Sequence, residues 1–547
     1  MSDVRILFAS LVLLALPLTA CADAVSDGQK VFGAQCALCH DASPNKAQLQ
    51  GPPLNGVVGR KVGSVAGFAY TDALKAAGAK GETWDEAKLD KFLSDPQSVM
   101  PGTAMPVSVT DATDRKVLVA YLSSLNGSAS NGPAKAAAKT ASTIGDWRQD
   151  EPGAKHRVTV AGLPEPFATP SASNGPGVVD ADKAAPQVPA GFKVSVFAAN
   201  LNRPRQIRVA PTGDLFVAEA GKNRVVVFHN ANGKLSSTPE NFVSEIQDPF
   251  GIAFYPATKP QFVYLASPTS VIRVPFSGGA KEAVIANLAP GGGHSSRDLA
   301  FSPDGKYLYV SVGSASNVGE NMDDQPQGWA AGHPLGEAWG PESGRAQVLR
   351  FDVNGQNRHV VATGIRNCVT LGIGPDGAPF CTVNERDGLG EDLVPDYFSH
   401  VEDGHYYGWP WYYLGNHEDP RQKGKRPDLA GKATVPDLLL ASHSAPLGFT
   451  FYHAPAGAAH PFPAAYDGNA FVALHGSWNR AKRTGSKVVR VVMKNGRPTG
   501  EYEDFMTGLV IDDSRVSGRP VGVAVGPDGA LYISDDAGGK IWKIEKE

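Results

Sequence analysis

Residues 192–547 repeat one pattern six times, and this repetition constrains the fold more than any other feature of the sequence. Each copy contains an apolar strand, a short turn rich in Pro, Asp and Gly, and a second apolar strand. Alternating apolar residues bounded by such turns predict β-hairpins. The predicted hairpins are Ile207–Glu219, Ile252–Ala266, Leu299–Val312, Leu371–Val383, Phe449–Leu474 and Val523–Ser534. The chain is therefore predicted to contain six copies of one β unit.

The two ends of this repeated region complement each other. A third strand follows most hairpins, but the last copy ends one strand short at Lys546, while an additional strand, Phe192–Phe197, precedes the first hairpin. Pairing these ends would close a ring, so the sequence predicts an all-β, six-bladed β-propeller over residues 191–547. A β-sandwich is the alternative.

A different kind of domain is indicated near the amino terminus by the segment Cys36-Ala37-Leu38-Cys39-His40. Two thiols at this spacing can add to the vinyl groups of a haem, and the adjacent His can ligate its iron. A redox dithiol or half of a zinc site are the alternatives, but no second Cys pair lies nearby. The motif predicts a covalently attached haem c, with Cys36 and Cys39 as thioether residues and His40 as an iron ligand.

The residues after this motif predict helices and a second iron ligand. Thr83–Leu93 has a helical apolar face, and Thr110 is a predicted N-cap of a further helix. Between them, a Pro- and Gly-containing loop carries Met100 and Met105. A thioether on such a loop is a suitable sixth ligand for haem iron, although Met also serves as a packing residue.

Residues 25–126 closely resemble the class I, mitochondrial-type cytochromes c, which are small all-α domains. The matching segments are Gly51-Pro52, Gly59-Arg60-Lys61, Gly67–Ala73, Thr83-Trp84 and Pro101–Met105. The resemblance implies that Met105 is the sixth ligand. It also implies that Arg60, Tyr70 and Trp84 lie beside the haem propionates.

The first residues predict export. Ile6–Leu18 is an apolar run too short to span a bilayer, and it follows Arg5, as in a signal peptide covering residues 1–24. Leu18–Cys21 also resembles a lipobox, whose cleavage after residue 20 would leave a lipid anchor at Cys21. Both alternatives place the protein in the periplasm without a transmembrane segment. The formal net charge of −4 does not suggest a nucleic-acid partner.

Between the two predicted domains the composition changes twice. Residues 127–143 are mostly Ala, Ser, Gly, Lys and Pro, which predicts a flexible linker. Residues 144–190 remain rich in Pro but gain apolar residues such as Trp147 and Phe167, which predicts an extended arm lying on the second domain. Within that domain, Cys368 and Cys381 could form a disulfide or remain two separate buried thiols.

Loops of the repeated region carry groups suited to catalysis and to anion binding. His294 follows three glycines and precedes Arg297, and an imidazole there is a candidate general base. Several Arg residues from separate repeats suggest an anionic ligand on the axis of the ring. Glu385, Asp387, Glu391 and Asp392 lie among glycines, which suggests calcium coordination or a solvated acidic loop.

From Trp147 to its end the chain resembles the glucose/sorbosone dehydrogenase family, and most of all its sorbosone dehydrogenase-like members. The segments that carry this resemblance are Asp146–Asp150, Gly191–Lys193, His294 with Arg297, Arg366-Asn367, Asn384–Gly388, Tyr407–Pro410 and His475–Arg480. Members of the family are six-bladed propellers that use pyrroloquinoline quinone (PQQ) and calcium.

The resemblance assigns roles to individual residues. It implies that His294 takes the proton of a substrate hydroxyl group, with Arg366 at the catalytic centre. The residues implied to hold PQQ are Arg297, Arg366, Asn367, Arg480 and Arg519. Calcium is expected at Asp392 and the Tyr407 carbonyl, with Glu385 and Asp387 from the acidic loop.

These features together predict a periplasmic PQQ-dependent sugar or aldose dehydrogenase of the sorbosone type. Two electrons from the reduced quinone would pass singly to the chain's own haem c and then to a respiratory acceptor. A calcium-dependent propeller lactonase is one alternative, suggested by the acidic loop. A non-catalytic electron-transfer or carbohydrate-binding protein is another.

Overall fold

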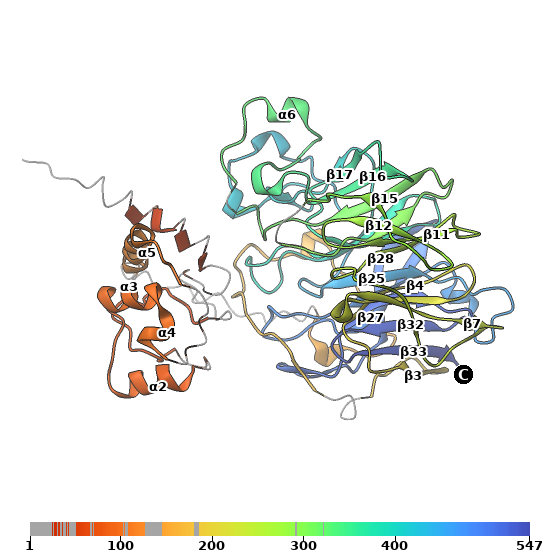
Figure 1. Cartoon of the computed structure of the whole chain (residues 1–547), viewed down its shortest axis with the longest axis horizontal. Helices are drawn as coiled ribbons and strands as arrows, with labels where there is room; N and C mark the ends of the chain where they lie inside the picture. Colours follow the sequence, from red (N-terminus) through yellow and green to blue (C-terminus); the bar gives the residue numbers. More distant parts are fainter. Residues whose placement is uncertain are drawn as a thin grey trace, which may run out of the picture. The chain divides into compact units, whose positions relative to one another are not determined.

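The computed structural model describes residues 24–25, 27–29, 31–32, 35–36, 40, 42, 51–65, 68, 70–101, 103, 105, 108–125, 145–179, 185–289, 293–320 and 322–547. The chain divides into two compact units, residues 1–137 and 138–547 (Figure 1). The predicted signal peptide, Cys21, Cys39 and the linker 127–143 fall outside the described residues. Where the structure describes the chain, no helix is long and apolar enough to cross a bilayer.

The first unit is helical. Its helices after His40 are α2 Asp72–Ala79, α3 Glu86–Ser94, α4 Pro96–Val99 and α5 Ala112–Ser124. They enclose an apolar core that contains Phe92, Leu118, Leu122 and the side chain of Met100, which is 6% exposed. These helices are too short to be stable in isolation, so the burial of one apolar face of each helix stabilises them.

Two predicted helix starts in this unit are wrong by one to three residues. Helix α3 begins after Asp85, whose carboxylate accepts a hydrogen bond from Lys88 N (2.7 Å). Helix α5 begins after Asp111, whose carboxylate accepts from the backbone N–H groups of Thr113 and Asp114. A carboxylate at the N-cap both accepts hydrogen bonds from the free backbone N–H groups and interacts favourably with the helix dipole. Thr83 lies outside the helix and forms a β-bridge with Lys61.

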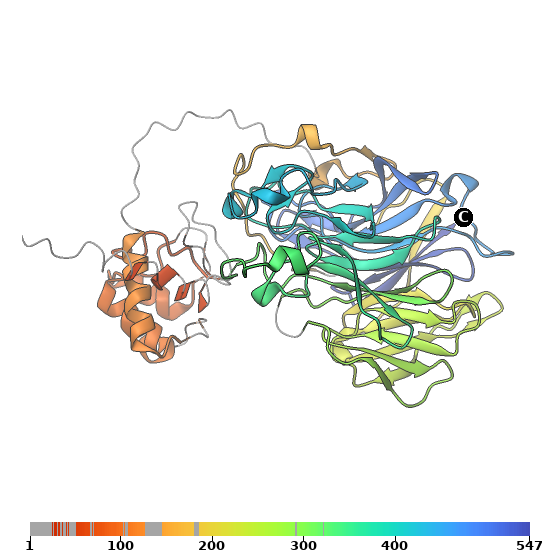
Figure 2. The ribbon, with the colours of Figure 1, turned by 90° about the horizontal axis from the view of Figure 1, so that it is seen from above.

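The second unit contains six larger sheets among its described residues, and each begins with one of the predicted hairpins. Figure 2 shows this β-rich unit from above. The first three are β4 Pro204–Val209, β5 Leu215–Glu219, β6 Arg224–Phe228 and β9 Glu240–Ser244; β10 Ile252–Tyr255, β11 Phe262–Ala266, β12 Val271–Pro275 and β13 Glu282–Ile285; and β14 Leu299–Phe301, β15 Tyr307–Val312, β16 Gln347–Asp352, β17 His359–Thr363 and β21 His405–Tyr406.

The remaining three large sheets follow in chain order. They are β18 Cys368–Ile373, β19 Pro379–Val383, β20 Tyr397–His400 and β24 Leu438–Leu439; β25 Pro446–Phe451, β26 Ala470–Leu474, β27 Lys487–Lys494, β28 Arg497–Met506 and β1 Lys155–His156; and β31 Pro520–Val525, β32 Leu531–Asp535, β33 Lys540–Lys546 and β3 Phe192–Ala198.

Smaller elements lie between these sheets. The short strands are β2 Gly177–Val178, β7 Asn230–Ala231, β8 Lys234–Leu235, β22 Tyr412–Tyr413, β23 His417–Glu418, β29 Val510–Asp512 and β30 Arg515–Val516. The short helical turns are η1 Trp147–Gln149, η2 Val160–Gly162, η4 Ala220–Lys222, α6 Trp329–Gly332, η5 Gly340–Glu342, η6 Pro420–Gln422, η7 Pro427–Leu429 and η8 Ala464–Tyr466.

The sheets follow one another in a cycle. Their first strands contact one another in the order β4, β10, β14, β18, β25, β31 and back to β4. The predicted pairing of the two ends is confirmed, since β3 pairs with β33 from Phe192–Lys546 to Ala198–Ile541. Apolar clusters fill the contacts between consecutive sheets, including the one that joins the sixth sheet to the first.

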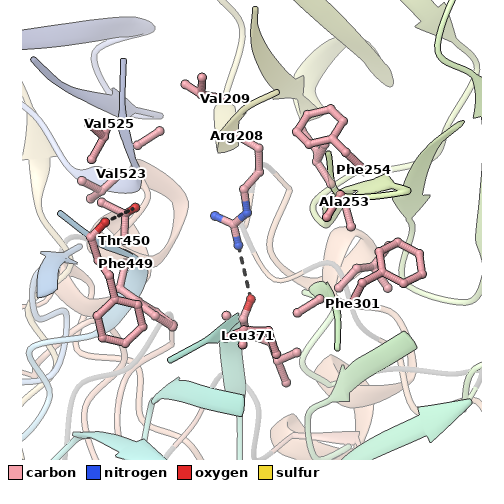
Figure 3. A pocket seen from close by; sticks show the side chains of 18 residues that line it. Arg208, Val209, Ala253, Phe254, Phe301, Leu371, Phe449, Thr450, Val523 and Val525 are labelled. Atoms are coloured by element: carbon pink, nitrogen blue, oxygen red, sulfur yellow. Dashed lines mark hydrogen bonds between the residues drawn. The ribbon is translucent and has the colours of Figure 1, made fainter. Parts of the chain in front are cut away.

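The first strands of all six sheets line one cavity of about 410 Å³ (Figure 3). Its wall is mostly apolar, with Phe254, Phe301 and Phe449 on separate sheets. Arg208 reaches across it and donates to the Leu371 carbonyl (3.4 Å) and to the buried carboxylate of Asp298 (2.8 Å). The half-buried Arg208 and the fully buried Asp298 thus form an ion pair beside the cavity.

Residues 145–179 run along the surface of the second unit. Asp150 forms an ion pair with the buried Lys487 (2.6 Å), and Trp147 donates to Asp513 (2.9 Å). Further along, Asn174 N–H donates to the carbonyl of Trp478, and β2 pairs with β30. The segment is thus fixed to the fifth and sixth sheets by polar contacts.

Cys368 and Cys381 form a disulfide, with their Cα atoms 5.4 Å apart. They lie on the adjacent strands β18 and β19, where Cys368 is opposite Val383, Cys381 is opposite Leu371, and the register shifts between Cys368 and Thr370. The question that the sequence left open is therefore decided by strand pairing.

Candidate functional site

The predicted site residues of the second unit lie in loops at one end of the first strands. His294 and Arg297 precede β14, Arg366 and Asn367 precede β18, and Arg519 precedes β31. The acidic loop follows β19 and Arg480 follows β26. In an antiparallel hairpin, the start of the first strand and the end of the second lie at the same edge. Sequence positions far apart thus meet at one end of the unit.

His294 has a defined tautomer. Its Nδ1 lies 3.0 Å from the carbonyl oxygen of Ser314, an acceptor, so Nδ1 carries the proton and Nε2 keeps its lone pair. Burial and the neighbouring charge of Arg366 lower the pKa of His294 to about 3. The imidazole is therefore neutral at physiological pH and presents Nε2 as a proton acceptor.

Arg366 and Asn367 lie beside His294. A methyl group at Gly313 would lie 2.6 Å from Asn367 Oδ1 and 2.7 Å from His294 Cβ, so a residue without a side chain is needed between them. Arg366 donates to the carbonyls of Asn384 (3.1 Å) and Glu385 (2.8 Å). This arginine therefore fixes the start of the acidic loop next to His294.

Asn317 joins these groups and was not singled out from the sequence. Its Oδ1 accepts from Arg366 Nη2 (3.0 Å) and from Asp387 N (2.9 Å), and its carbonyl accepts from Arg366 Nε and Trp409 Nε1. The partners lie 49 to 92 residues away in the chain. A lone Asn in a long loop gives no sequence signal for such a role.

Asp387 lies among polar partners. Its Oδ1 accepts from Asn479 Nδ2 (2.5 Å) and lies 3.4 Å from His443 Nδ1, and its Oδ2 lies 3.5 Å from Arg366 Nη2. Although burial acts in the opposite direction, His443 and Arg366 hold the pKa of Asp387 below its usual value. His443, also missed from the sequence, is buried and donates through Nε2 to the Gly390 carbonyl (3.0 Å).

The buried arginines at this end bond largely to backbone carbonyls. Arg297 donates to the carbonyls of His294 (2.8 Å) and Ser296, and Arg519 donates to those of His475 and Gly476. Burial lowers the pKa of both arginines to about 10. The partners of Arg297 are neutral carbonyls, which leave its positive charge available to an anionic ligand, whereas Asp536 offsets part of the charge of Arg519.

These features fit PQQ, which is a flat quinone with three carboxylates. Arg297 Nε and Asn367 Oδ1 are buried without a hydrogen-bond partner in the part of the chain that the structure describes. Such atoms are costly unless a ligand supplies their partners. Arg480 differs from the other predicted PQQ residues, because it already contacts Asp392 (3.3 Å) and the Glu391 carbonyl.

The carboxylates predicted to bind calcium are each paired with other side chains. Glu385 is paired with Arg386 (3.0 Å), Asp392 with Arg480, and Asp387 with Asn479 and Arg366. The side chain of Tyr407 is buried in the apolar core and its hydroxyl group donates to the His400 carbonyl (2.7 Å), while calcium binding by the Tyr407 backbone carbonyl stays a prediction. No group of three metal-ligating side chains occurs among the described residues. Each carboxylate has its own polar or cationic partner, which removes the excess negative charge that a calcium site requires.

Asn317 leads to a prediction for stability. Asn317→Ala should lower the free energy of unfolding of the second unit by about 2 kcal/mol, because Arg366 Nη2 and Asp387 N lose their shared acceptor. Urea unfolding monitored by tryptophan fluorescence measures this change. Asn241→Ala, at an exposed position of β9, is the control and should change stability little. Equal effects of the two substitutions would contradict the linking role of Asn317.

In the first unit, a hydrogen bond fixes the orientation of the His40 ring. Its Nδ1 donates to the Pro52 carbonyl (2.8 Å), which leaves Nε2 available. A Cβ atom at Gly51 would lie 2.2 Å from the His40 ring, so only glycine fits there. Cys36 is buried in the same core. These residues fit a covalently attached haem.

The other predicted haem residues surround this core. Arg60 donates to the Pro53 carbonyl (2.6 Å), and Trp84 packs edge-on against Phe92. Burial raises the pKa of Tyr70, and Arg60 acts against this shift. Met105 is half-buried against the core, whereas Met100 is fully inside it. Met105 remains the predicted iron ligand, and Met100 has the burial of a packing residue.

Comparison with known proteins agrees with this division. The TrAA12-like family model matches residues 186–395 and 419–547, and the Cytochrome c model matches residues 25–126. An uncharacterized protein of Borreliella burgdorferi is 26% identical over 384 residues, which are 66% of this chain and 91% of that protein. Cytochrome c2 of Rhodomicrobium vannielii is 45% identical over 101 residues, which are 18% of this chain and 78% of that protein.

Two solved structures share the fold of the second unit. The holo form of the pyranose dehydrogenase PQQ domain from Coprinopsis cinerea has a TM-score of 0.53 at 21% identity, covering 68% of this chain and 99% of that one. The calcium structure of the Trichoderma reesei Carbohydrate-Active Enzymes Family AA12 protein has a TM-score of 0.54 at 20% identity, with the same coverage of 68% and 99%. At these identities the similarity establishes a common fold.

Proposed function

The chain belongs to the TrAA12-like family and carries a cytochrome c domain, and from this we propose that it is an exported, PQQ-dependent sugar dehydrogenase. Its second unit is a six-bladed β-propeller that oxidises an aldose or a sorbosone-type sugar. Its first unit takes the electrons one at a time and delivers them to a respiratory acceptor in the periplasm.

One observation carries this proposal. A neutral His294, with Nε2 as a proton acceptor, lies among buried arginines whose partners are mainly backbone carbonyls. A base next to a strongly anion-binding surface suits oxidation of a hydroxyl group against an anionic quinone. A hydrolase would have no use for the attached cytochrome c domain.

The chain's own residues act as follows. When bound, PQQ supplies a two-electron acceptor. Arg297, Arg366, Asn367 and Arg519 hold its carboxylates and carbonyls, with Arg480 at the edge of the site. His294 Nε2 accepts the hydroxyl proton of the sugar, while the Ser314 carbonyl keeps the other ring nitrogen protonated.

The cytochrome c domain supplies the outlet. We assign Cys36 and Cys39 to the haem thioethers, His40 and Met105 to the iron, and Arg60, Tyr70 and Trp84 to the propionates. When bound, haem accepts one electron at a time, so one sugar requires two successive transfers. With His40 and Met105 both serving as iron ligands, the haem would pass electrons rather than bind a substrate.

A reconstitution experiment tests the function. Full-length, haem-loaded protein is mixed with PQQ, and the absorbance band of reduced haem is followed after addition of aldoses, alcohols, aldehydes or lactones. We expect reduction with at least one sugar and none when PQQ is omitted. Absence of reduction with every substrate would contradict the proposal, and lactone turnover without quinone would indicate a hydrolase instead.

A further inference from the structure

We propose that Asp387 is the carboxylate that compensates the positive charge formed on His294 when this base takes the substrate proton. The inference rests on the proposed function. In the step concerned, the O–H bond of the sugar breaks and its proton joins His294 Nε2. PQQ, when bound, would supply the acceptor for the hydride from the carbon that carries this hydroxyl group. Asp387 is not assigned a contact with a reacting atom. It is a positioning residue that acts through its negative charge on His294.

The surroundings of His294 make such a residue necessary. Arg297 Nη1 and Arg345 Nη2 donate to the His294 carbonyl (2.8 and 3.4 Å). Arg366 is fixed beside the ring, because its own carbonyl accepts from Ser314 N (2.8 Å), and Ser314 in turn bonds to His294 Nδ1. A protonated His294 imidazole would therefore lie close to three positively charged guanidinium groups. Their electrostatic repulsion is large in a site that contains little water.

The acidic groups near His294 differ in how far they can offset this charge. Glu342 is fully buried, and its two oxygens accept from Ala315 N (2.7 Å) and Ser316 Oγ (2.5 Å). Asp387 contacts Arg366 itself (3.5 Å) and its side chain is 27% exposed, so its charge is not enclosed as that of Glu342 is. The charged groups that face His294 are Arg297, Arg345, Arg366, Glu342 and Asp387, with His443 behind Asp387.

Asp387 is held in place from both sides. Its backbone N–H donates to Asn317 Oδ1, and its carbonyl accepts from Arg421 Nη1 (2.6 Å). On the other side, Asn479 Nδ2 donates to its Oδ1 (2.5 Å) and also lies 3.0 Å from His443 Nδ1. These contacts come from three different loops and fix the carboxylate at a constant position. A fixed charge costs no reorganisation when the proton moves.

A thiol probe tests this charge coupling without PQQ or sugar. In haem-loaded full-length protein, His294→Cys places a titratable thiol at the position of the base, and its alkylation rate by iodoacetamide is followed by peptide mass spectrometry from pH 5 to pH 10. Adding Asp387→Asn should lower the pKa of this thiol by about one pH unit, because a nearby negative charge disfavours the thiolate. Adding Asp528→Asn, which removes a buried carboxylate paired with Lys543 (2.9 Å), should leave the thiol pKa unchanged.

Kinetics provide the second measurement. Asp387→Asn should lower kcat about tenfold with KM within twofold of the wild-type value, and Asp387→Glu should restore most of kcat. An unchanged thiol pKa would overturn the proposal even if kcat fell, since the loss would then be structural. Failure of the proposed function would appear differently, as wild-type protein that oxidises no sugar while the thiol pKa still shifts.

Discussion

Replacing His294 with Gln should reduce kcat for sugar oxidation about a thousandfold, which is within the range that general-base catalysis contributes. Glutamine retains a side-chain donor for the Ser314 carbonyl but has no group that can take the hydroxyl proton. PQQ affinity should change little, because the arginines that would hold its carboxylates remain. Steady-state rates with an artificial dye as acceptor measure kcat independently of the haem.

His453→Gln is the matched control for this substitution. His453 is exposed and bonds only locally, to Asp467 (3.0 Å), at the turn side of the fifth sheet. We expect its kcat to equal that of the wild type. If His294→Gln and His453→Gln were equally active, His294 would not be the base.

The same histidine sets an expected pH dependence. Its pKa in the folded protein, about 3, lies below the 6.5 of an unfolded histidine, so its neutral form is the one present above roughly pH 5. The folded state consequently loses stability as pH falls below the unfolded pKa, since the unfolded chain binds this proton first. Above roughly pH 5, where His294 is neutral, kcat should not decrease with falling pH because of protonation of this residue.

Replacing Met105 with Ala should stop electron exit through the haem while sugar oxidation continues. Loss of a thioether ligand should lower the haem reduction potential by more than about 100 mV, within the range that axial ligands control. Potentiometric titration measures the potential, and dye-linked assays measure sugar oxidation. Haem-dependent turnover should fall close to zero, and dye-linked kcat should stay within twofold of the wild-type value.

Met100→Leu separates ligation from packing. Met100 is 6% exposed within the apolar core, so leucine at this position should cost little stability and leave the potential unchanged. A large shift of potential in Met100→Leu instead of Met105→Ala would reverse the ligand assignment. An equal loss of dye-linked oxidation in Met105→Ala would contradict the separation of the two units' roles.

Local pattern predicted much of the fold. The six hairpins found in the sequence coincide with the first two strands of each large sheet, and the strand at Phe192 pairs with the last one. The recognised combination of a class I cytochrome c with a domain like the PQQ-dependent sugar dehydrogenases is confirmed by the family matches. Strand β20 was missed, because Tyr397–His400 follows a long acidic loop rather than a short turn.

Helix boundaries and the acidic loop show where local pattern fails. Threonine and aspartate both serve as N-caps, so the sequence alone did not distinguish Thr110 from Asp111. The helix predicted over Thr83–Leu93 begins three residues later, after Asp85. In the acidic loop, four carboxylates near one another in sequence suggested calcium. The structure instead gives Glu385, Asp387 and Asp392 separate partners from residues 386, 479 and 480.

The sequence by itself determined the strand pattern and the Cys36–His40 motif, because both depend on residues within a few positions of one another. Only the tertiary structure decided which charged groups meet. Asn317 lies 70 residues from Asp387, Asp387 lies 92 residues from Asn479, and His443 lies 36 residues from Asn479. No local sequence pattern encodes such pairings. The physical reason is that a buried charge is defined by its neighbours in space, which the closure of the sheets brings together.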